Sequence, residues 1–555
     1  MNRRKLLKGI SLSVPSFWLS RAVGKDFIQD ATGPLIPGMA KGPFNPDWKS
    51  LQQYKVPQWY KNAKFGIWAH WGPQCQPERG DWYARGMYQE GSDQYKFHIE
   101  KYGHPSKFGF KDVINEWKAE QWNPDELMAL YKRTGAQYFV ALANHHDNFD
   151  LYNSSYQPWN STKMGPRKDI VGGWAKAAKK QGITFGVSVH SAHAWSWLET
   201  AQRSDKSGPE KGVPYDGKTT KADGSGKWWA GYNPQDLYEQ DHALSENSQD
   251  NGMIHKQWNW GNGVNVPTKA YCDKFLNRTI ELIDKYKPDL VYFDDTALPL
   301  WPISDAGLKI AAHMYNNSIK RNGELRAVIN GKILSDEQKK CLVWDIERGQ
   351  SDKIEPDTWQ TCTCIGSWHY DRRIYDKHGY KSAKNVIQML ADVVSKNGNL
   401  LLSVPLRGDG TIDSDERAIV EDIATWMTVN QECIYDTRPW KIFGEGPAQE
   451  HSAPLSAQGF NEGKGKPFTA EDIRFTTKNG SLYAIILGIP GEELIIKSLS
   501  SDNRLIGSEK IANVNLLGFN EKLNWEQTAT GLKVTMPNTK PSNHTIVLKI
   551  KGLSI

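Results

Sequence analysis

Six stretches of this chain run apolar and then end in acids, histidines or tryptophans. They are Phe65–Gly72, Tyr138–Asp147, Phe185–His193, Leu290–Thr296, Ala327–Gly331 and Leu342–Gly349. Carboxylates and imidazoles are side chains that transfer protons or attack carbon in enzymes. In a barrel of eight parallel strands the strands are buried, and the reactive groups collect where each strand ends. The pattern therefore predicts one active site built from the ends of several strands.

Two neighbouring acids, Asp294 and Asp295, lie near the end of the fourth stretch. Burying a carboxylate without a partner is costly, so an acidic pair at the end of an apolar strand indicates a functional role. Successive residues of a strand face opposite sides, and only one of the two acids can point at a substrate. The residues themselves leave open which one it is.

Histidines follow the first two stretches: His70 in AHWG, then His145 and His146 beside Asp147. Such a group suits a metal site or hydrogen bonds to the hydroxyl groups of a sugar. The first strand supplies one histidine and no H-x-H pair, and no clear carboxylate–histidine set has metal-ligand spacing. We therefore expect neither a metal nor another cofactor. Neutral imidazoles that hydrogen-bond sugar hydroxyl groups suit the site equally well, and they agree with the family resemblance described below. A metal-dependent amidohydrolase is the alternative.

Amphipathic helices with capping residues at their borders separate the apolar runs, at residues 124–134, 169–180 and 270–286. Alternating strands and helices predict a parallel sheet, closed as a (β/α)8 barrel over residues 40–442. An open doubly wound sheet is disfavoured because no glycine-rich phosphate loop follows the early strands.

Two regions depart from this alternation. A polar, glycine-rich insert at about residues 200–267 nevertheless holds Trp228, Trp229, Tyr232, Trp258 and Trp260. Long ordered loops are usually functional, and aromatic rings are costly if they are simply exposed. Residues 443–555 contain short alternating strands, which predict a C-terminal antiparallel β-sandwich.

Composition and charge argue against nucleic-acid binding. The 555 residues include 69 basic and 63 acidic ones without long runs of one sign, so nothing favours nucleic acid as a partner.

Residues 1–30 combine a basic head with a short apolar run and predict a twin-arginine-like export signal. No later segment approaches the length of a membrane span. We expect a periplasmic or secreted protein that has no membrane anchor after signal removal.

Several ordered motifs resemble those of glycoside hydrolase family 29, the retaining α-L-fucosidases. KFGIWAHWG at 64–72 is similar to the family's K-F-G-I-F-x-H-W-G, and NHHDNFDLYNS at 144–154 to its K-H-H-D-G-F segment. PDLVYFDD at 288–295 resembles the nucleophile strand, written D-x-x-W-F-D-G. NGNLLLSVPLRGDGTI at 397–412 looks like the end of the family barrel. The resemblance covers residues 59–440.

The resemblance implies roles for individual residues. It places the nucleophile at Asp294, with Asp295 where the family has a small residue. It also places sugar-binding histidines at His70, His145 and His146. The residues alone leave open which of the two neighbouring acids is the nucleophile, so this choice rests on the resemblance.

Two substrate-binding positions depart from the family pattern. Asp81, followed by Trp82, stands where the family has the glutamate of Glu-Trp-Tyr. His190 stands where many members have a tyrosine. Trp368 in SWHY is a candidate ring against the apolar edge of the sugar.

We place the general acid/base at Glu347, near the end of the sixth stretch, with Asp345 and Glu355 as alternatives. Retaining hydrolysis uses two carboxyl groups about 5 to 5.5 Å apart, one to attack the anomeric carbon and one to protonate the departing oxygen. On this hypothesis Asp294 is ionised and Glu347 keeps its proton until the bond breaks.

The resemblance therefore implies an exo-acting retaining glycosidase that removes terminal α-L-fucose from an oligosaccharide or polysaccharide. Activity on terminal α-L-galactose of an algal or other polysaccharide is the first alternative, because this sugar differs only by a hydroxyl group at carbon six. A carbohydrate-binding protein that kept the barrel without catalysis is the second.

Overall fold

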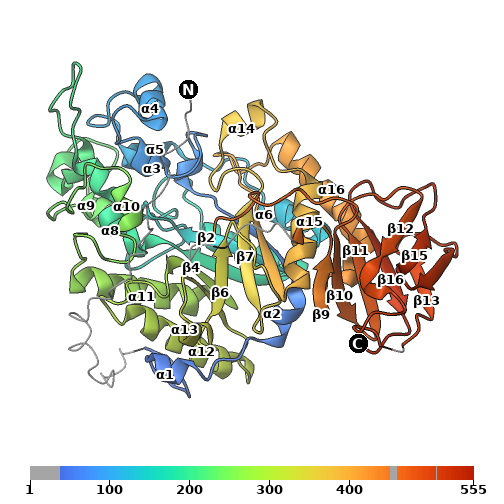
Figure 1. Cartoon of the computed structure of the whole chain (residues 1–555). Coiled ribbons are helices and arrows are strands. Elements are labelled where there is room, and N and C mark those ends of the chain that lie inside the picture. Colours follow the sequence, from blue (N-terminus) through green and yellow to red (C-terminus); the bar gives the residue numbers. More distant parts are fainter. Residues whose placement is uncertain (1–37, 450–454, 456–458, 508) are drawn as a thin grey trace, which may run out of the picture. The chain divides into compact units, whose positions relative to one another are not determined.

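Eight parallel strands close into a barrel (Figure 1), which confirms the predicted fold class. The computed structural model describes residues 38–449, 455, 459–507 and 509–555, so the expected export signal at residues 1–30 lies outside the described residues. The barrel strands are β1 (Phe65–Ala69), β2 (Tyr138–Asn144), β3 (Thr184–Val189), β4 (Leu290–Thr296), β5 (Val328–Lys332), β6 (Val343–Glu347), β7 (Trp359–Cys364) and β8 (Gly398–Ser403). They pair in chain order, and β8 returns to pair with β1.

Helices surround the strands. β1, β2 and β8 are buried along their whole length, as continuous apolar runs in a barrel require. The helix expected at 124–134 is confirmed, because Asn123 caps its first turn and Gly135 ends it in the left-handed conformation. None of the described helices is both long and apolar enough to cross a membrane. The longer helices are α6 (Pro124–Thr134), α7 (Ile170–Gln181), α11 (Lys269–Tyr286), α12 (Ala306–Asn322), α15 (Ala383–Ser395) and α16 (Ser414–Asn430).

The aromatic-rich insert of residues 200–267 follows β3 and is held by buried polar contacts. Asp216 accepts hydrogen bonds from the hydroxyl groups of Tyr88 and Tyr238 at 2.6 and 2.7 Å, and from Lys111 Nζ at 2.6 Å. A buried polar group with all its partners in place favours one loop conformation.

Shorter helices occur in the insert and elsewhere in the chain. They are α1 (Trp48–Leu51), α2 (Gln58–Ala63), α3 (Tyr83–Gly86), α4 (Asp93–Tyr102), α5 (Phe110–Glu116), α8 (Ala194–Trp197), α9 (Gln235–Tyr238), α10 (Met253–Lys256), α13 (Asp336–Lys339) and α14 (Arg372–Asp376).

The C-terminal region forms two antiparallel sheets around one apolar core, in line with the predicted sandwich. Its strands are β9 (Arg438–Glu445), β10 (Ile473–Lys478), β11 (Ser481–Ile486), β12 (Glu493–Ile496), β13 (Asn513–Leu516), β14 (Trp525–Thr528), β15 (Gly531–Thr535) and β16 (Ile546–Lys551). Five strands follow the order β13-β16-β11-β10-β9, and three follow the order β12-β15-β14. β9 begins ahead of the expected boundary at residue 443, because it pairs with β10.

A buried ion pair fixes the loop that follows β2, and this loop carries His145 and His146. The Arg278 guanidinium on α11 contacts both carboxylate oxygens of Asp150, with Nη2–Oδ1 at 2.7 Å and Nε–Oδ2 at 2.8 Å. It also donates to Asn148 Oδ1 at 2.6 Å. Both charged side chains are buried. Each therefore depends on the other for compensation of its charge.

We predict that Arg278→Met lowers the free energy of unfolding by about 3 kcal/mol or more, because Asp150 stays buried without its cation. The exposed pair Lys180–Asp125 provides the control, and Lys180→Met changes stability by less than about 1 kcal/mol. Thermal and urea unfolding followed by circular dichroism measures both variants. Equal stability of the two would show that the buried pair does not hold the loop.

Candidate active site

A cavity of about 370 Å³ opens at the carboxyl ends of the barrel strands, where the sequence pattern predicts the site. His146 is the one predicted residue outside its wall, and it is fully buried against Asp294. The remaining predicted residues come together in this wall, although they lie in or directly after different strands. They are Asp294, Glu347, His70, Asp81, Trp82, His145, His190 and Trp368.

Lys332, the last residue of β5, joins the two predicted catalytic acids. Its ammonium nitrogen contacts Asp294 Oδ1 on β4 and Glu347 Oε2 at the end of β6. β5 lies between β4 and β6, so one long side chain at its end reaches both neighbours. Two oxygens on one ammonium nitrogen at ordinary ion-pair lengths are at most about 6 Å apart. The two carboxyl groups therefore lie close to each other, as retaining hydrolysis requires.

The surroundings shift the pKa values of the two acids in opposite directions. Burial by itself raises the pKa of Asp294, but Lys332 and the contacts from His146 and His190 hold that pKa well below its usual range. Burial raises the pKa of Glu347; Lys332 opposes this effect, and the negative charge of Asp294 adds to it. Asp294 is therefore ionised, and Glu347 is the acid that keeps a proton to higher pH.

Histidines contact Asp294 through its second oxygen. His146 Nε2 lies 3.1 Å and His190 Nδ1 3.3 Å from Asp294 Oδ2. His146 Nδ1 donates to the carbonyl oxygen of His190 at 2.6 Å, which fixes the ring. The neighbouring Asp295 instead contacts His193, with Oδ1–Nε2 at 3.1 Å. The structure thus places Asp294, and not Asp295, between the lysine and the histidines after β2 and β3.

His70, His145 and His190 supply neutral imidazoles to the cavity wall. Burial lowers the pKa of His190 to about 4 and the pKa values of His70 and His145 well below their usual range. Gln74 Nε2 donates to His145 Nδ1 at 2.9 Å, which leaves the ring hydrogen on the other nitrogen. A neutral imidazole offers one donor and one acceptor, and sugar hydroxyl groups require both.

Asp81 and Trp82 come from the loop after β1 and meet the insert. Asp81 Oδ1 lies 2.7 Å from His369 Nδ1. The Trp82 ring stacks on His255 and Trp258, with ring centres 5.2 and 6.3 Å apart and interplanar angles of 14° and 16°. His255 and Trp258 also line the cavity. The insert therefore contributes aromatic wall to the site, in keeping with its aromatic residues.

The two alternatives for the acid/base lie outside this wall. Asp345 is buried inside the barrel and accepts a hydrogen bond from the Tyr292 hydroxyl at 3.1 Å. Glu355 accepts one from the Ser351 hydroxyl at 2.6 Å. Neither occurs among the described residues that line the cavity, whereas Glu347 does.

Comparison with known proteins identifies the family. The model of the family described as Alpha-L-fucosidase matches residues 37–432. The chain belongs to the α-L-fucosidase family. The model of the α-L-fucosidase C-terminal domain matches residues 466–551. The resemblance found in the motifs is thereby confirmed, and the family places the chain among the glycoside hydrolases.

Similar members of the α-L-fucosidase family span most of the chain. Tissue α-L-fucosidase of Bos taurus is 26% identical over 90% of this chain and 88% of its own length. The tissue enzyme of Rattus norvegicus is 25% identical over 91% of both chains. The crystal structure of Thermotoga maritima α-fucosidase in complex with a mechanism-based inhibitor is 25% identical, with a TM-score of 0.65. The match covers 91% of this chain and 99% of the Thermotoga chain.

The sequence pattern does not predict two parts of this fucosidase-family site. The first is Lys332, which directly follows the fifth apolar stretch. Its position could have indicated it, because the stretches before and after it carry the acids Asp294 and Glu347 near their ends. Phe460 lines the cavity from beyond the barrel, and its amide donates to the Glu347 carbonyl oxygen at 2.8 Å. Gly459 allows this approach, because its φ is +96° and a Cβ there would lie 2.3 Å from the same oxygen. No local pattern predicts that contact.

Three groups of side chains in the fucosidase-family site bring possible metal ligands together. They are His70–His145–His190, Asp81–His145–His369 and His146–His190–Asp294, and the ligand atoms of each group lie within 4.8 Å of one another. Sequence spacing does not reveal these groups, because their members follow different strands. The expectation that the site uses no metal stays a prediction.

We predict that Lys332→Met lowers kcat/KM for p-nitrophenyl α-L-fucoside by about 100-fold or more, because the cation between the two acids is lost. The pKa of Asp294 rises without this cation, so the acidic limb of the pH–rate profile moves to higher pH. Lys340→Met removes an exposed lysine paired with Glu337 and is the control, with an unchanged profile. An acidic limb that stays in place in Lys332→Met would disprove the role of the lysine.

Proposed function

We propose that this chain hydrolyses terminal α-L-fucosides and retains the configuration of the anomeric carbon. Membership of the α-L-fucosidase family supports the substrate. The observation that carries the mechanism is the contact of Asp294 and Glu347 with one Lys332 ammonium in the wall of one cavity. It holds two acids, whose pKa values are shifted in opposite directions, at the short spacing that a covalent intermediate requires.

In the first step the Asp294 carboxylate attacks the anomeric carbon and forms a glycosyl ester. Glu347 gives its proton to the glycosidic oxygen, and the rest of the substrate leaves as an alcohol. The bond from the anomeric carbon to the departing oxygen is thus exchanged for a bond to Asp294. Lys332 stays beside both acids and stabilises the negative charge that moves between them.

In the second step Glu347 acts as a base. Formation of the ester removes the charge of Asp294, and this charge is one of the causes that raise the pKa of Glu347. Lys332 remains in contact with Glu347 and favours its ionised form. Glu347 then takes a proton from a water molecule that attacks the anomeric carbon, and Asp294 leaves as a carboxylate. Two inversions restore the original configuration.

The remaining wall residues suit a sugar ring. Neutral imidazoles can hydrogen-bond hydroxyl groups, and the indole faces can pack against the apolar edge of the ring. The buried His146 is a positioning residue for Asp294. We assign sugar binding to His70, Asp81, Trp82, His145, His190 and Trp368.

A terminal α-L-galactoside is the alternative substrate of the same site. Asp81 and His255 both line the cavity, and they offer polar partners for an additional hydroxyl group at carbon six. The shorter acid at position 81 also leaves more room than a glutamate would. A parallel assay of p-nitrophenyl α-L-fucoside and α-L-galactoside ranks the two substrates by kcat/KM.

We predict that Asp294→Ala abolishes turnover of p-nitrophenyl α-L-fucoside, because no carboxylate remains to attack the anomeric carbon. Added azide ion partly restores activity, because it occupies the place of the missing carboxylate. Glu355→Ala is the matched control, since that acid lies outside the cavity wall, and it keeps full activity. Normal turnover by Asp294→Ala would remove this residue from the mechanism.

Two further measurements on the wild type test the stereochemistry and the need for a metal. Proton NMR of the first product anomer shows retention if the two-carboxylate scheme holds, and an inverted product would contradict it. Treatment with EDTA leaves the rate unchanged if the histidines bind sugar and not a metal. A catalytically silent binding protein would release no p-nitrophenol at all.

We also propose export of this glycosidase by the twin-arginine route to the periplasm or the medium. The support is the basic head with Arg3 and Arg4 and the short apolar run in residues 1–30. Replacement of both arginines by lysine then keeps the protein in the cytoplasm. Cell fractionation measures this, and an unchanged distribution would contradict the route.

A further inference from the structure

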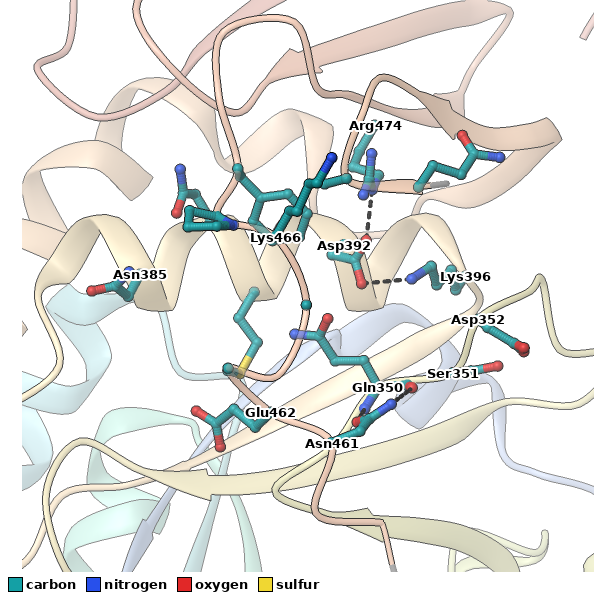
Figure 2. Close-up of a pocket in the computed structure, with 18 of the residues that line it drawn as sticks. Gln350, Ser351, Asp352, Asn385, Asp392, Lys396, Asn461, Glu462, Lys466 and Arg474 are labelled. Atoms are coloured by element: carbon teal, nitrogen blue, oxygen red, sulfur yellow. Dashed lines mark hydrogen bonds and ion pairs between the residues drawn. The ribbon is translucent and has the colours of Figure 1, made fainter. Parts of the chain in front are cut away.

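A second cavity, of about 450 Å³, lies between the barrel and the segment that leads into the C-terminal sheets (Figure 2). Its wall combines the loop after β6, the helix α15 and residues 461–474. The proposed catalytic acids do not belong to it. We call it the second cavity and define it by Gln350, Asn385, Asp392, Lys396, Lys466 and Arg474.

The two cavities share a wall. Glu347 and Arg348 line the active-site cavity, and Gln350 lines the second cavity. Likewise, Phe460 lines the active-site cavity and its neighbour Asn461 lines the second. Gln350 N donates to Asn461 Oδ1 at 2.8 Å, so the two segments are tied together. Since consecutive Cα atoms are about 3.8 Å apart, very little chain separates the cavities.

In the proposed reaction the shared wall would stand on the side where the leaving group departs. Glu347 protonates the glycosidic oxygen in the proposed reaction, so the rest of a glycan must extend past this residue. Arg348 and Phe460 come next along the wall. Arg348 Nε lies 3.8 Å from Glu462 Oε2, and Glu462 lines the second cavity. This ion pair spans the shared wall, so a glycan that extends past Glu347 would meet the rim of the second cavity next.

Cationic side chains outnumber acids in the second cavity. Asp392 contacts both Lys396 Nζ at 2.7 Å and Arg474 Nε at 2.6 Å, so one acid is shared by two cations (Figure 2). Lys384 and Lys466 have no ion pair with another residue in the described part of the chain. The charged wall residues are Lys381, Lys384, Lys396, Lys466 and Arg474 against Asp352, Asp392 and Glu462. The cavity therefore has a surplus of positive charge.

Aromatic rings hold the two buried cations in place. The Arg474 guanidinium carbon lies 5.4 Å from the ring centre of Phe443 and 5.1 Å from that of Phe468. Lys396 Nζ lies 4.7 Å from the ring centre of Phe443. Arg474 and Lys396 are 2% and 5% exposed. Arg474 Nε and Nη1 already donate to Asp392 Oδ1 and to the Ile473 carbonyl oxygen, so this guanidinium contributes its positive charge to the cavity more than free donors.

We propose that the second cavity binds an anionic sugar unit of the same glycan, beyond the cleaved bond, through its sulfate ester or carboxylate group. The proposal rests on the proposed function, because it needs Glu347 to face the leaving group. Amide side chains such as Gln350 and Asn385 supply hydrogen bonds to the hydroxyl groups of that unit. The cavity then gives the enzyme a preference for acidic glycans over short neutral fucosides.

The test compares four substrates with the wild type and with Lys384→Glu/Lys466→Glu. Three are fucosyl oligosaccharides of equal length that carry a sulfate ester, a uronate carboxylate or no charge, and the fourth is p-nitrophenyl α-L-fucoside. In the variant, KM rises about fivefold for the sulfated or the uronate substrate, whichever the cavity binds. The reason is that two positive charges of the cavity wall become negative. Its kcat stays the same, as do both parameters for the neutral substrates. The sulfate and carboxylate arms show which group is bound.

Lys464→Glu is the matched control, because Lys464 lies in the same loop but outside the wall of the second cavity, and it leaves all four substrates unaffected. Equal KM values for charged and neutral oligosaccharides in the wild type would overturn the proposal. So would a rise in KM that is the same for all four substrates. If the wild type does not cleave the p-nitrophenyl fucoside, the proposed function fails instead. Titration calorimetry with the anionic oligosaccharides then tests the cavity directly, and no loss of affinity in the variant would refute it.

Discussion

The Lys332 ammonium lies between two carboxyl groups that the barrel brings close together. Two like charges about 5 Å apart at an effective dielectric constant of about 20 repel each other by about 3 kcal/mol. A cation between them, or a proton on one of them, removes this cost. Lys332 supplies the cation, and the raised pKa of Glu347 means that this acid keeps a proton to higher pH than Asp294 does. The neutral histidines fit the same balance, because burial keeps them from adding further charge.

The sequence predicts the barrel and the position of its site because both depend on local periodicity. An apolar run followed by a reactive residue marks each strand end, and parallel strands bring those ends to one face. The choice between Asp294 and Asp295 as nucleophile does not depend on local periodicity. It depends on which residues each of the two carboxylates contacts. Those partners, Lys332 at the end of β5 and His193 after β3, come from other parts of the barrel. The motifs of the family supply the choice that the residues alone leave open.

The departures from the family pattern have partners in this structure. Asp81 is shorter than the family's glutamate, and it meets His369 at 2.7 Å. His190, expected at a position where many members have a tyrosine, lies against the carboxylate of Asp294. The insert adds His255 and Trp258 to the wall, where they stack on Trp82. Each contact joins residues that are distant in the chain, which is why spacing alone does not reveal it.

Gly459 links the C-terminal region to the strand that carries Glu347. A side chain at this position would collide with the main chain of the catalytic strand, and the amide of the next residue binds the same carbonyl oxygen. The active-site cavity is therefore not built by the barrel alone. A shortened protein that stops after α16 would lack Phe460, the one described residue of the cavity wall that comes from beyond the barrel. An exchange of C-terminal regions between relatives would work only where the donor brings a glycine to this position.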